Sequence, residues 1–384
     1  MLKNLRVSLK AISVIVGTII GVGIFGLPQA VARIGFFPGI VMLALLSLAT
    51  LYLHYLYGEI VLRTKSKKRL VGYAEKYLGS RGKTIAAASA LFGLVGSQLA
   101  YLIVGGDFLK IISRNILGSN PLFYIAIFLI VGSLVVLKGT SAIASVDFLM
   151  SVFLITVIVV IFCIAFPQID TDHFSGINMK NTFPAYGVML FSLSGAIAIP
   201  ETIEYLRKKK NKNYKTVITV GTILPHLLYV LFIVATVGLV GRTIGESAIA
   251  DLETYLGSNI VIIGALFGII AIFTSFIVTG ATLMKILWYD YKIPKLLSWL
   301  IISILPLVLF IGGIQSFILI IGVVGAVMGG IDGILVILIF QKLKKSSNSK
   351  PVIVSEFSQL LKWLLLTIFI VGILYEIYYF ASTR

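Results

Sequence analysis

The sequence predicts an all-α integral membrane protein. Of its 384 residues, 59% are hydrophobic and only 12% are charged, and the mean hydropathy is +1.06, values that soluble globular domains do not reach. Apolar stretches of roughly 20 residues, long enough to cross a bilayer, recur about eleven times. The polar stretches between them are too short for a core of their own. We therefore expect one membrane domain over residues 1–384.

The expected spans share an apolar length of membrane-crossing size. They lie at 11–36, 38–62, 84–112, 121–138, 143–167, 184–206, 215–241, 258–290, 296–312, 315–341 and 358–381. Between the second and third spans, residues 71–78 fit either a short interfacial helix or a solvated loop.

The basic residues set the expected orientation. They give a net charge of +17 and gather at 65–69, 207–212 and 342–350, in loops that all face one side if the N-terminus is cytoplasmic, as the positive-inside rule requires. This placement favours contact with membrane lipid over nucleic acid. We expect a multi-pass protein of the cell membrane, with the C-terminus outside. A single cysteine, Cys163, excludes an intramolecular disulfide and a thiolate metal site.

Two spans carry glycine and proline at their centres. Gly23 precedes Pro28 by five positions in the first span, and Gly195 precedes Pro200 by five in the sixth. Pro kinks and small-residue packing are common in membrane helices, but paired interruptions opening two halves point to a solute site. Since five spans separate the two, the halves at 11–167 and 184–341 are expected to be inverted repeats, followed by an extra helix at 358–381.

The chain resembles the amino acid/polyamine/organocation superfamily, and most closely its amino acid/auxin permease family of small neutral amino acid transporters. The resemblance rests on GTIIGVGIFGLPQAVARIGF in the first span, GSQLAYLIVGGDFL in the third and LFSLSGAIAIPETIEYL in the sixth. It implies a five-plus-five inverted repeat whose first and sixth spans unwind in mid-membrane to hold the solute.

The substrate residues that the resemblance implies are Gly21, Val22, Gly23, Ile24, Phe25, Tyr101, Phe191, Ser192, Ser194, Gly195 and Ile197. Backbone N–H groups of the first break would bind the carboxylate of an amino acid, and oxygens of the second break would bind its ammonium. Tyr101 either closes over the carboxylate or is an ordinary core tyrosine. The uncharged lining favours a small neutral substrate.

The coupling ion is expected to be Na⁺ or H⁺, and no other cofactor is expected. The resemblance implies a Na⁺ site formed by Gly17, Ile20, Ala271, Thr274 and Ser275, although membrane Thr and Ser often bond within their own helix instead. Ile24 stands where some relatives have an asparagine ligand, which argues against a second Na⁺ site. The fifth span lacks the lysine that replaces Na⁺ in some relatives, which favours Na⁺ modestly.

Ionisable residues within membrane spans are functional suspects because they are costly there. Asp332 is the leading proton-relay candidate. Glu201 and Glu204 could form an inner gate with the basic residues that follow them, and Asp147 could pair with the same bases; structural ion pairs are the alternative in each case. The three histidines are scattered and predict no metal-ligand set.

These observations predict a secondary transporter that imports a small neutral amino acid by alternating access. An amino acid sensor of the same fold, which binds without transporting, is the alternative, because its binding chemistry would be identical. An enzyme is disfavoured because the sequence pairs no nucleophile with a base. A channel is disfavoured because no charged ring or carbonyl filter is repeated. The sequence indicates no oligomeric state.

Overall fold

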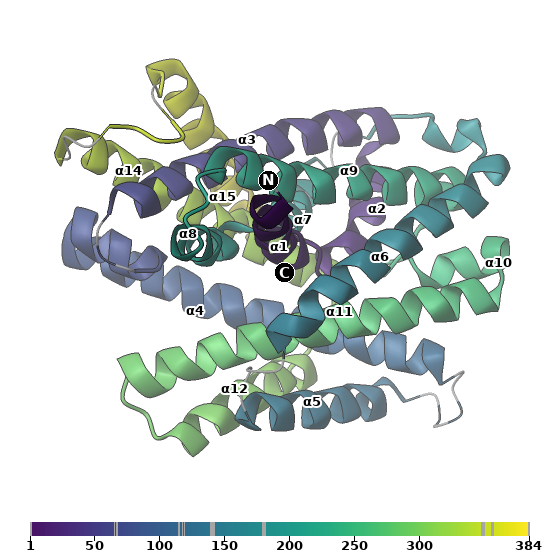
Figure 1. Cartoon of the computed structure of the whole chain (residues 1–384). Helices are drawn as coiled ribbons and strands as arrows, with labels where there is room; N and C mark the ends of the chain where they lie inside the picture. The colour runs from purple at the N-terminus through teal and green to yellow at the C-terminus, as the bar shows by residue number, and fades with distance from the viewer. Residues whose placement is uncertain are drawn as a thin grey trace.

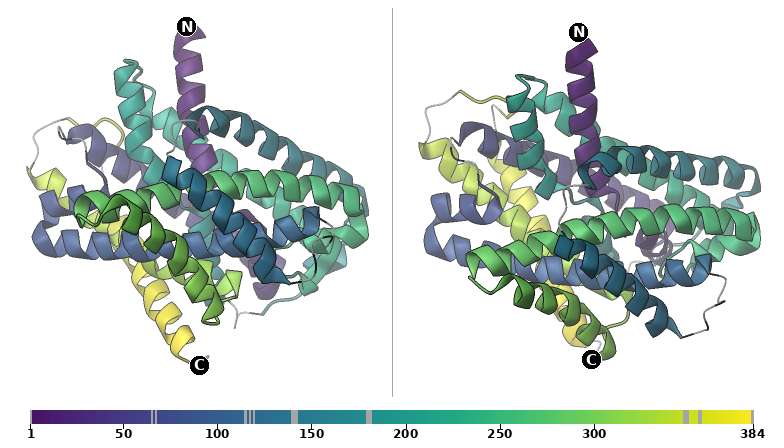
Figure 2. Two further views of the ribbon diagram at one scale, coloured as in Figure 1. Left: turned by 90° about the horizontal axis from the view of Figure 1, so that it is seen from below. Right: turned by 60° about the horizontal axis from the view of Figure 1, so that its bottom comes forward.

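The computed structural model of the chain is all-helical in the part that it describes (Figure 1). The described residues are 2–64, 66, 68–113, 116, 118, 120–138, 143–178, 182–346, 350–354 and 357–382. The N-terminus projects from one side of the body and the C-terminus lies on the opposite side (Figure 2).

The helices follow the order of the expected spans. The first group comprises α1 (Leu2–Ile19), α2 (Gly23–Ile34), α3 (Phe36–Arg63), α4 (Leu70–Ile112), α5 (Pro121–Lys138) and α6 (Ile143–Ala165). The second group comprises α7 (Thr182–Leu193), the 3₁₀ turn η4 (Ala196–Ala198), α8 (Ile199–Lys208), α9 (Tyr214–Val240), α10 (Glu253–Leu256), α11 (Ser258–Lys285), α12 (Lys295–Ile311), α13 (Phe317–Val323), the π-helical η8 (Val324–Gly329) and α14 (Gly330–Ser346). The extra helix is α15 (Gln359–Ser382).

The helix lengths agree with a multi-pass membrane protein. Within the described residues, eight helical segments are long and apolar enough to span a membrane, and the bent pair α1 and α2 would make a ninth. Two shorter apolar helices, Val152–Gln168 and Lys295–Ile311, lie where the fifth and ninth spans were expected. The exact count of eleven spans stays a prediction.

The third expected span is longer than its apolar core. Residues 71–78 are helical and continuous with α4, which kinks at Gly79, where φ is +76°. Glycine suits this position because other residues rarely adopt a positive φ. Residues 71–78 are therefore helical rather than a loop, and their interfacial position stays a prediction.

Helices α1 and α8 cross several of the long helices at a steep angle. Figure 1 shows α1 and α8 end-on, whereas α3, α4, α9 and α11 lie across the view. After α8, the side-chain amide of Asn211 donates to the carbonyl of Asn4 at 3.0 Å and to the hydroxyl of Ser8 at 3.1 Å. These bonds hold the end of α8 against the beginning of α1.

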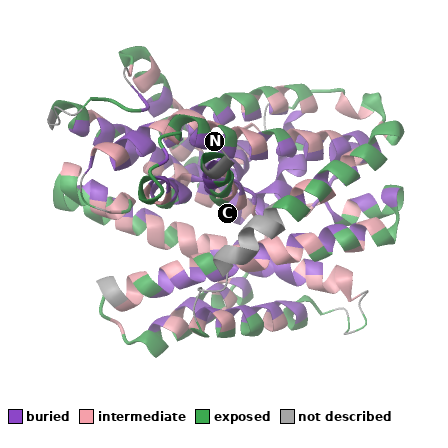
Figure 3. Cartoon of the chain, viewed as in Figure 1, coloured by how far each residue is buried: buried purple, intermediate pink, exposed green. Residues whose placement is uncertain are grey.

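The buried apolar core runs through the body (Figure 3) and includes Ile20 and Val22 at the junction of α1 with α2, and Leu193 and Ala198 at the junction of α7 with α8. Ile15, Leu27 and Phe232 are almost fully buried there, whereas Phe37 and Leu48 are 67% and 62% exposed on the outside of α3. Large exposed apolar side chains along a helix of this length are expected where it faces lipid. The two interrupted spans therefore lie within the buried core.

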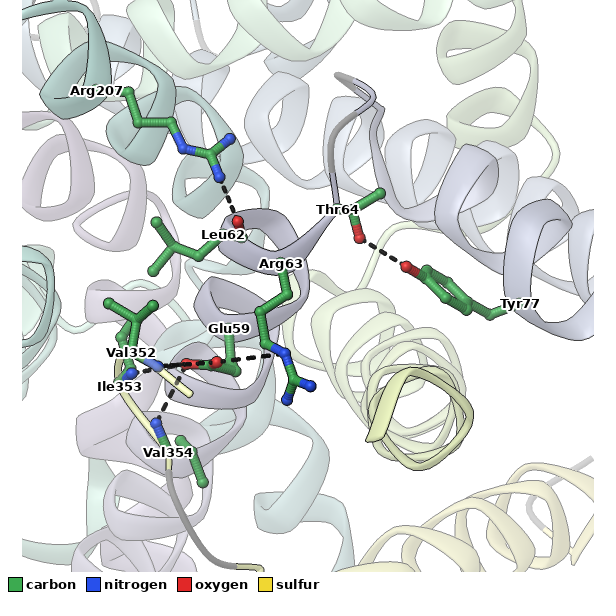
Figure 4. Close-up of polar contacts among 9 residues, drawn as sticks. All are labelled: Glu59, Leu62, Arg63, Thr64, Tyr77, Arg207, Val352, Ile353 and Val354. Carbon is green, nitrogen blue, oxygen red and sulfur yellow. Dashed lines mark hydrogen bonds and ion pairs between the residues drawn. The ribbon is translucent and has the colours of Figure 1, made fainter. Parts of the chain in front are cut away.

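A short strap, residues 350–354, crosses the end of α3 (Figure 4). The fully buried carboxylate of Glu59 accepts hydrogen bonds from the backbone N–H groups of Val352, Ile353 and Val354, at 2.6–3.3 Å. Arg63 lies 3.9 Å from the same carboxylate. Because successive N–H groups turn toward one acceptor, the strap binds the carboxylate as a small anion nest.

Candidate functional site

The first break separates α1 from α2 by a bend of 57°. The amide of Ile20 still donates to the Val16 carbonyl at 2.9 Å, but Ile20, Gly21 and Val22 are not helical. Gly23 and Ile24 begin α2, so helix geometry leaves their N–H groups without intrahelical acceptors. The unwound stretch is thus shorter than the expected Gly21–Phe25 and begins one residue earlier, since the new helix restarts at Gly23.

The second break separates α7 from α8. Ser194 and Gly195 are non-helical, with φ −140° and ψ 13° at Gly195, and η4 follows. Phe191 and Ser192 are still in the last turn of α7. Pro200 lies in the first turn of α8, where a missing N–H costs no hydrogen bond. The break is therefore confined to Ser194–Ala198.

The two breaks contact each other closely. A Cβ atom added at Gly23 would lie 2.8 Å from the Cα atom of Ser192 and 2.5 Å from its Oγ atom. At Gly195, an added Cβ would collide with the side chain of Ile19 and lie 3.4 Å from the His54 ring. Glycine is therefore required at position 23, where the clash is with the Ser192 backbone, whereas a Cβ at position 195 would require the Ile19 side chain to move.

Side chains from α9 satisfy the carbonyl ends of both broken helices. The hydroxyl of Tyr229 lies 2.6 Å from the carbonyl oxygen of Ile19, at the end of α1, and 3.1 Å from that of Ser192, near the end of α7. The Nε2 atom of His226 lies 3.4 Å from the carbonyl of Leu193. Buried helix ends need such partners, because an unsatisfied carbonyl in this setting is costly.

His54 of α3 forms a hydrogen bond with a backbone amide of the second break. Its Nε2 atom accepts a hydrogen bond from the Gly195 N–H at 3.3 Å, and its Nδ1 atom lies 2.9 Å from the hydroxyl of Thr222. An imidazole nitrogen that accepts carries no hydrogen, so Nδ1 is the donor in the neutral ring. His54 therefore uses both nitrogens to tie the break to α3 and α9.

An aromatic cluster closes the α2 side of the breaks. The Phe25 ring packs edge-on against Phe108 and Phe232, with centroid distances of 4.7 and 6.2 Å, and an added Cβ at Gly268 would lie 2.9 Å from Phe25. On the other side, Ile197 is 51% exposed. The α2 side is therefore closely packed, whereas η4 is partly exposed.

Tyr101 and Ser275 lie over the first break. The Tyr101 hydroxyl and the Ser275 Oγ atom are 3.9 and 3.8 Å from the point where a Cβ of Gly21 would stand. Ser194 is exposed, and Phe191 is half-buried. The structure thus places Tyr101 and Ser275 beside Gly21 of the first break, and the substrate roles that the resemblance implied stay predictions.

One of the expected Na⁺ ligands has a hydrogen-bond partner within its own helix. The Thr274 hydroxyl donates to the Ala271 carbonyl at 2.9 Å within α11, which is the alternative use of such a hydroxyl. Gly17, Ala271, Thr274 and Ser275 are half-buried, whereas Ile20 is buried. Within the described residues, no three His, Cys, Asp or Glu side chains form a metal-ligand cluster.

The charged residues near α8 have an unexpected partner. Arg69, just before α4, pairs with Glu204 at 2.9 Å and with Glu201 at 3.4 Å. Arg207, one of the bases expected to pair with them, instead donates to the carbonyl of Leu62. The expected pairing of Glu201 and Glu204 with the bases that follow them is therefore corrected. Arg207, about one helical turn after Glu204, bonds to α3 instead, and Arg69 lies against the two acids.

Of the two remaining acidic candidates, Asp332 bonds to a neighbouring helix. Asp332 accepts a hydrogen bond from Ser89 of α4 at 2.8 Å, beside the π-helical turn η8. Asp147 lies near the start of α6, where the side chains are outside the described part of the chain.

Sequence reasoning missed the side chains that bind the breaks, namely Tyr229, His226 and His54. One signal was present: Thr222, His226 and Tyr229 are spaced four and three residues apart, which places three polar side chains on one face of a membrane helix. The buried Glu59, within an expected span, was missed as well.

The sequence profile of the tryptophan/tyrosine permease family matches residues 6–376. Glutamine transporter 2 of Aliivibrio fischeri is 24% identical over 321 residues, which cover 81% of this chain and 83% of that protein. Tyrosine-specific transport system 1 of Haemophilus influenzae is 24% identical over 360 residues, 88% of each chain.

Two solved structures have a similar fold. MhsT in complex with L-phenylalanine superposes with a TM-score of 0.63 at 12% identity and covers 98% of both chains. Mhp1, a nucleobase-cation-symport-1 family transporter in a closed conformation with bromovinylhydantoin bound, gives a TM-score of 0.66 at 14% identity, covering 98% of this chain and 93% of its own. At these identities the likeness concerns the fold alone.

Proposed function

Because this chain belongs to the tryptophan/tyrosine permease family, we propose that it is a secondary active transporter that imports a small neutral amino acid by alternating access. The family and its relatives are membrane transporters of amino acids rather than enzymes. The direction, the size of the substrate and the driving Na⁺ or H⁺ gradient are parts of the proposal. We also propose, as a finer assignment, that the chain is related to the amino acid/auxin permeases.

The observation that carries the proposal is the contact between the two breaks. The N–H groups at the start of α2 carry a positive partial charge, and the carbonyl ends of α1 and α7 carry a negative one. An amino acid has a carboxylate for the first and an ammonium for the second, so no charged side chain is needed. Phe191 and Ile197 offer an uncharged surface beside them, which suits a neutral side chain.

The relatives support a neutral substrate. Their names specify glutamine and tyrosine, and phenylalanine is bound in MhsT. We propose L-glutamine and L-tyrosine as the first two compounds to test. A transporter exchanges labelled for unlabelled substrate across a bilayer, so counterflow in proteoliposomes tests the proposal directly. Saturable binding of an amino acid without counterflow would instead favour the sensor.

A site variant locates the substrate. Gly23→Leu would place a large side chain against Ser192, where even a Cβ is too close, and we expect it to abolish counterflow. Full counterflow by Gly23→Leu would show that the substrate binds elsewhere.

The coupling ion is tested at α11. If Na⁺ binds Gly17, Ile20, Ala271, Thr274 and Ser275, replacing Na⁺ with K⁺ should slow uptake. Thr274→Ala should then slow uptake only when Na⁺ is present, because the lost hydroxyl is a ligand of the ion. If neither uptake nor the effect of Thr274→Ala depends on Na⁺, this site is wrong, and a proton relay through Asp332 becomes the remaining proposal.

A further inference from the structure

We propose that Tyr229 is a positioning residue that couples the two breaks to each other through a single hydroxyl. This role deepens the proposed function and rests on it in one respect, namely that an amino acid occupies the space beside Ser192. The coupling itself is a property of the empty protein and can be tested without substrate.

The geometry of Tyr229 is that of a bridge. Its hydroxyl contacts the carbonyl of Ile19 at 2.6 Å and that of Ser192 at 3.1 Å, and its side chain is 0% exposed. The two carbonyls belong to helices on opposite sides of the break pair, α1 and α7. No other hydroxyl among the described hydrogen bonds joins a residue of α1 to a residue of α7.

The chemistry of a phenol makes this bridge asymmetric. A tyrosine hydroxyl has one hydrogen and donates it to one carbonyl at a time, or shares it unequally. The shorter distance favours Ile19, so the Ser192 carbonyl keeps most of its capacity to accept. Ser192 is a proposed acceptor for the substrate ammonium. When a substrate ammonium binds the Ser192 carbonyl, the Tyr229 hydroxyl would donate its hydrogen to the Ile19 carbonyl alone. This stronger bond would hold α1 in place while the site is occupied.

The neighbouring histidines bind the rest of the second break, so among the described hydrogen bonds only the Tyr229 hydroxyl links the end of α7 to α1. His226, whose ring lies 6.4 Å from the Tyr229 ring in a stacked arrangement, binds Leu193, and His54 binds Gly195. Neither is hydrogen-bonded to α1 in the described network. Loss of the Tyr229 hydroxyl should therefore loosen α1 relative to α7 while leaving the break of α7 intact.

The first experiment uses no substrate. In a Cys163→Ser background, Ser194→Cys places a single thiol at the exposed start of the second break, and its rate of modification by a soluble maleimide reports access to the site. We expect Tyr229→Phe to raise this rate about five- to thirty-fold, the range that corresponds to losing one or two hydrogen bonds.

The control is Tyr186→Phe. Tyr186 is also a buried phenol on a membrane helix, and its hydroxyl donates to the carbonyl of Ile368 at 3.3 Å, away from both breaks. Tyr186→Phe should leave the modification rate unchanged. Equal rates in Tyr229→Phe and Tyr186→Phe would overturn the proposal, whether or not the protein transports an amino acid.

The second experiment separates positioning from stability. In counterflow of L-glutamine or L-tyrosine, we expect Tyr229→Phe to raise KM at least about fivefold with less than about twofold change in the maximal rate, because the site is misplaced rather than destroyed. Tyr186→Phe should change neither value. An unchanged KM in Tyr229→Phe would refute the role in substrate positioning, whereas absence of counterflow in the wild-type protein would refute only the proposed function.

A third variant keeps the test decisive if Tyr229→Phe does not fold. Incorporation of 3-fluorotyrosine at position 229 retains the ring and the hydroxyl and makes the hydroxyl a stronger donor. A tighter bridge should lower the maleimide modification rate of Ser194→Cys below that of the unfluorinated protein. A rate that stays the same or rises would contradict the bridge.

Discussion

Replacing Gly23 with alanine is the sharpest test of the contact between the breaks. The new Cβ atom would lie 2.8 Å from the Cα atom of Ser192, whereas ordinary contact begins at 3.4 Å. The backbones of α2 and α7 must therefore separate by at least about 0.6 Å, the difference between 3.4 and 2.8 Å. Ser192→Ala cannot relieve this clash, because the Cα atom remains.

The expected cost follows from packing. Interiors are close-packed and shift little, and an added methyl group in such a place costs about 1–3 kcal/mol. Displacing binding groups by a large fraction of an ångström weakens their interaction with the substrate. At an active site, a displacement of 1 Å can lower the reaction rate by about 100-fold. We expect Gly23→Ala to raise KM at least about tenfold and to lower the unfolding temperature by several degrees.

Counterflow in proteoliposomes and thermal unfolding in detergent measure the two effects. The control is Gly93→Ala on α4, where an added Cβ would meet the Met328 side chain at 3.5 and 3.8 Å, which is ordinary contact. Gly93→Ala should resemble the wild-type protein in both assays. If Gly23→Ala has a wild-type KM, the close approach of α2 to α7 is not part of the substrate site, and the reasoning fails.

Three further predictions concern charged groups. Glu59→Gln should lower the free energy of unfolding by about 2–4 kcal/mol, because a neutral amide replaces a buried carboxylate that holds three N–H groups of the strap. Arg69→Gln, which breaks the pairs with Glu201 and Glu204, should slow counterflow but cost at most about 1 kcal/mol of stability, because exposed ion pairs contribute little. Asp332→Asn keeps an acceptor for Ser89 but cannot release a proton, so it should abolish any acceleration of uptake by an inward proton gradient while counterflow continues.

Each of these has a result that contradicts it. Glu75→Gln is the control for Glu59, since Glu75 is an exposed acid paired with Lys83 at 2.9 Å; equal unfolding temperatures for the two variants would show that the strap adds no stability. Normal counterflow in Arg69→Gln would remove the ion pairs from the gate. Proton-driven uptake that survives in Asp332→Asn would exclude Asp332 as the relay.

Much of the site was predictable because its causes are local. Gly21 and Gly23 in the middle of an apolar stretch indicate a backbone that cannot stay helical, and Gly195 with Pro200 does the same in the sixth span. The boundaries were less predictable. The helix restarts at Gly23, and glycine freedom alone does not say where a helix resumes.

Partner choice was not predictable, and Arg69 illustrates the reason. Glu201 and Glu204 were expected to pair with nearby bases of the same loop, but the side chain that reaches them comes from a residue more than a hundred positions earlier in the chain. Which of several cationic side chains lies within 4 Å of these carboxylates depends on the angles at which the helices pack. The position of a charge in the sequence does not determine these angles.

The sequence by itself determined that this protein crosses the membrane many times and that two of its spans are interrupted, because hydrophobic length and backbone freedom are properties of the chain at each position. Only the tertiary structure decided that Tyr229 bridges Ile19 and Ser192, and that Glu59 binds amides 293–295 residues away. A buried polar group must find a partner, but the partner is whichever group packing brings within about 3 Å.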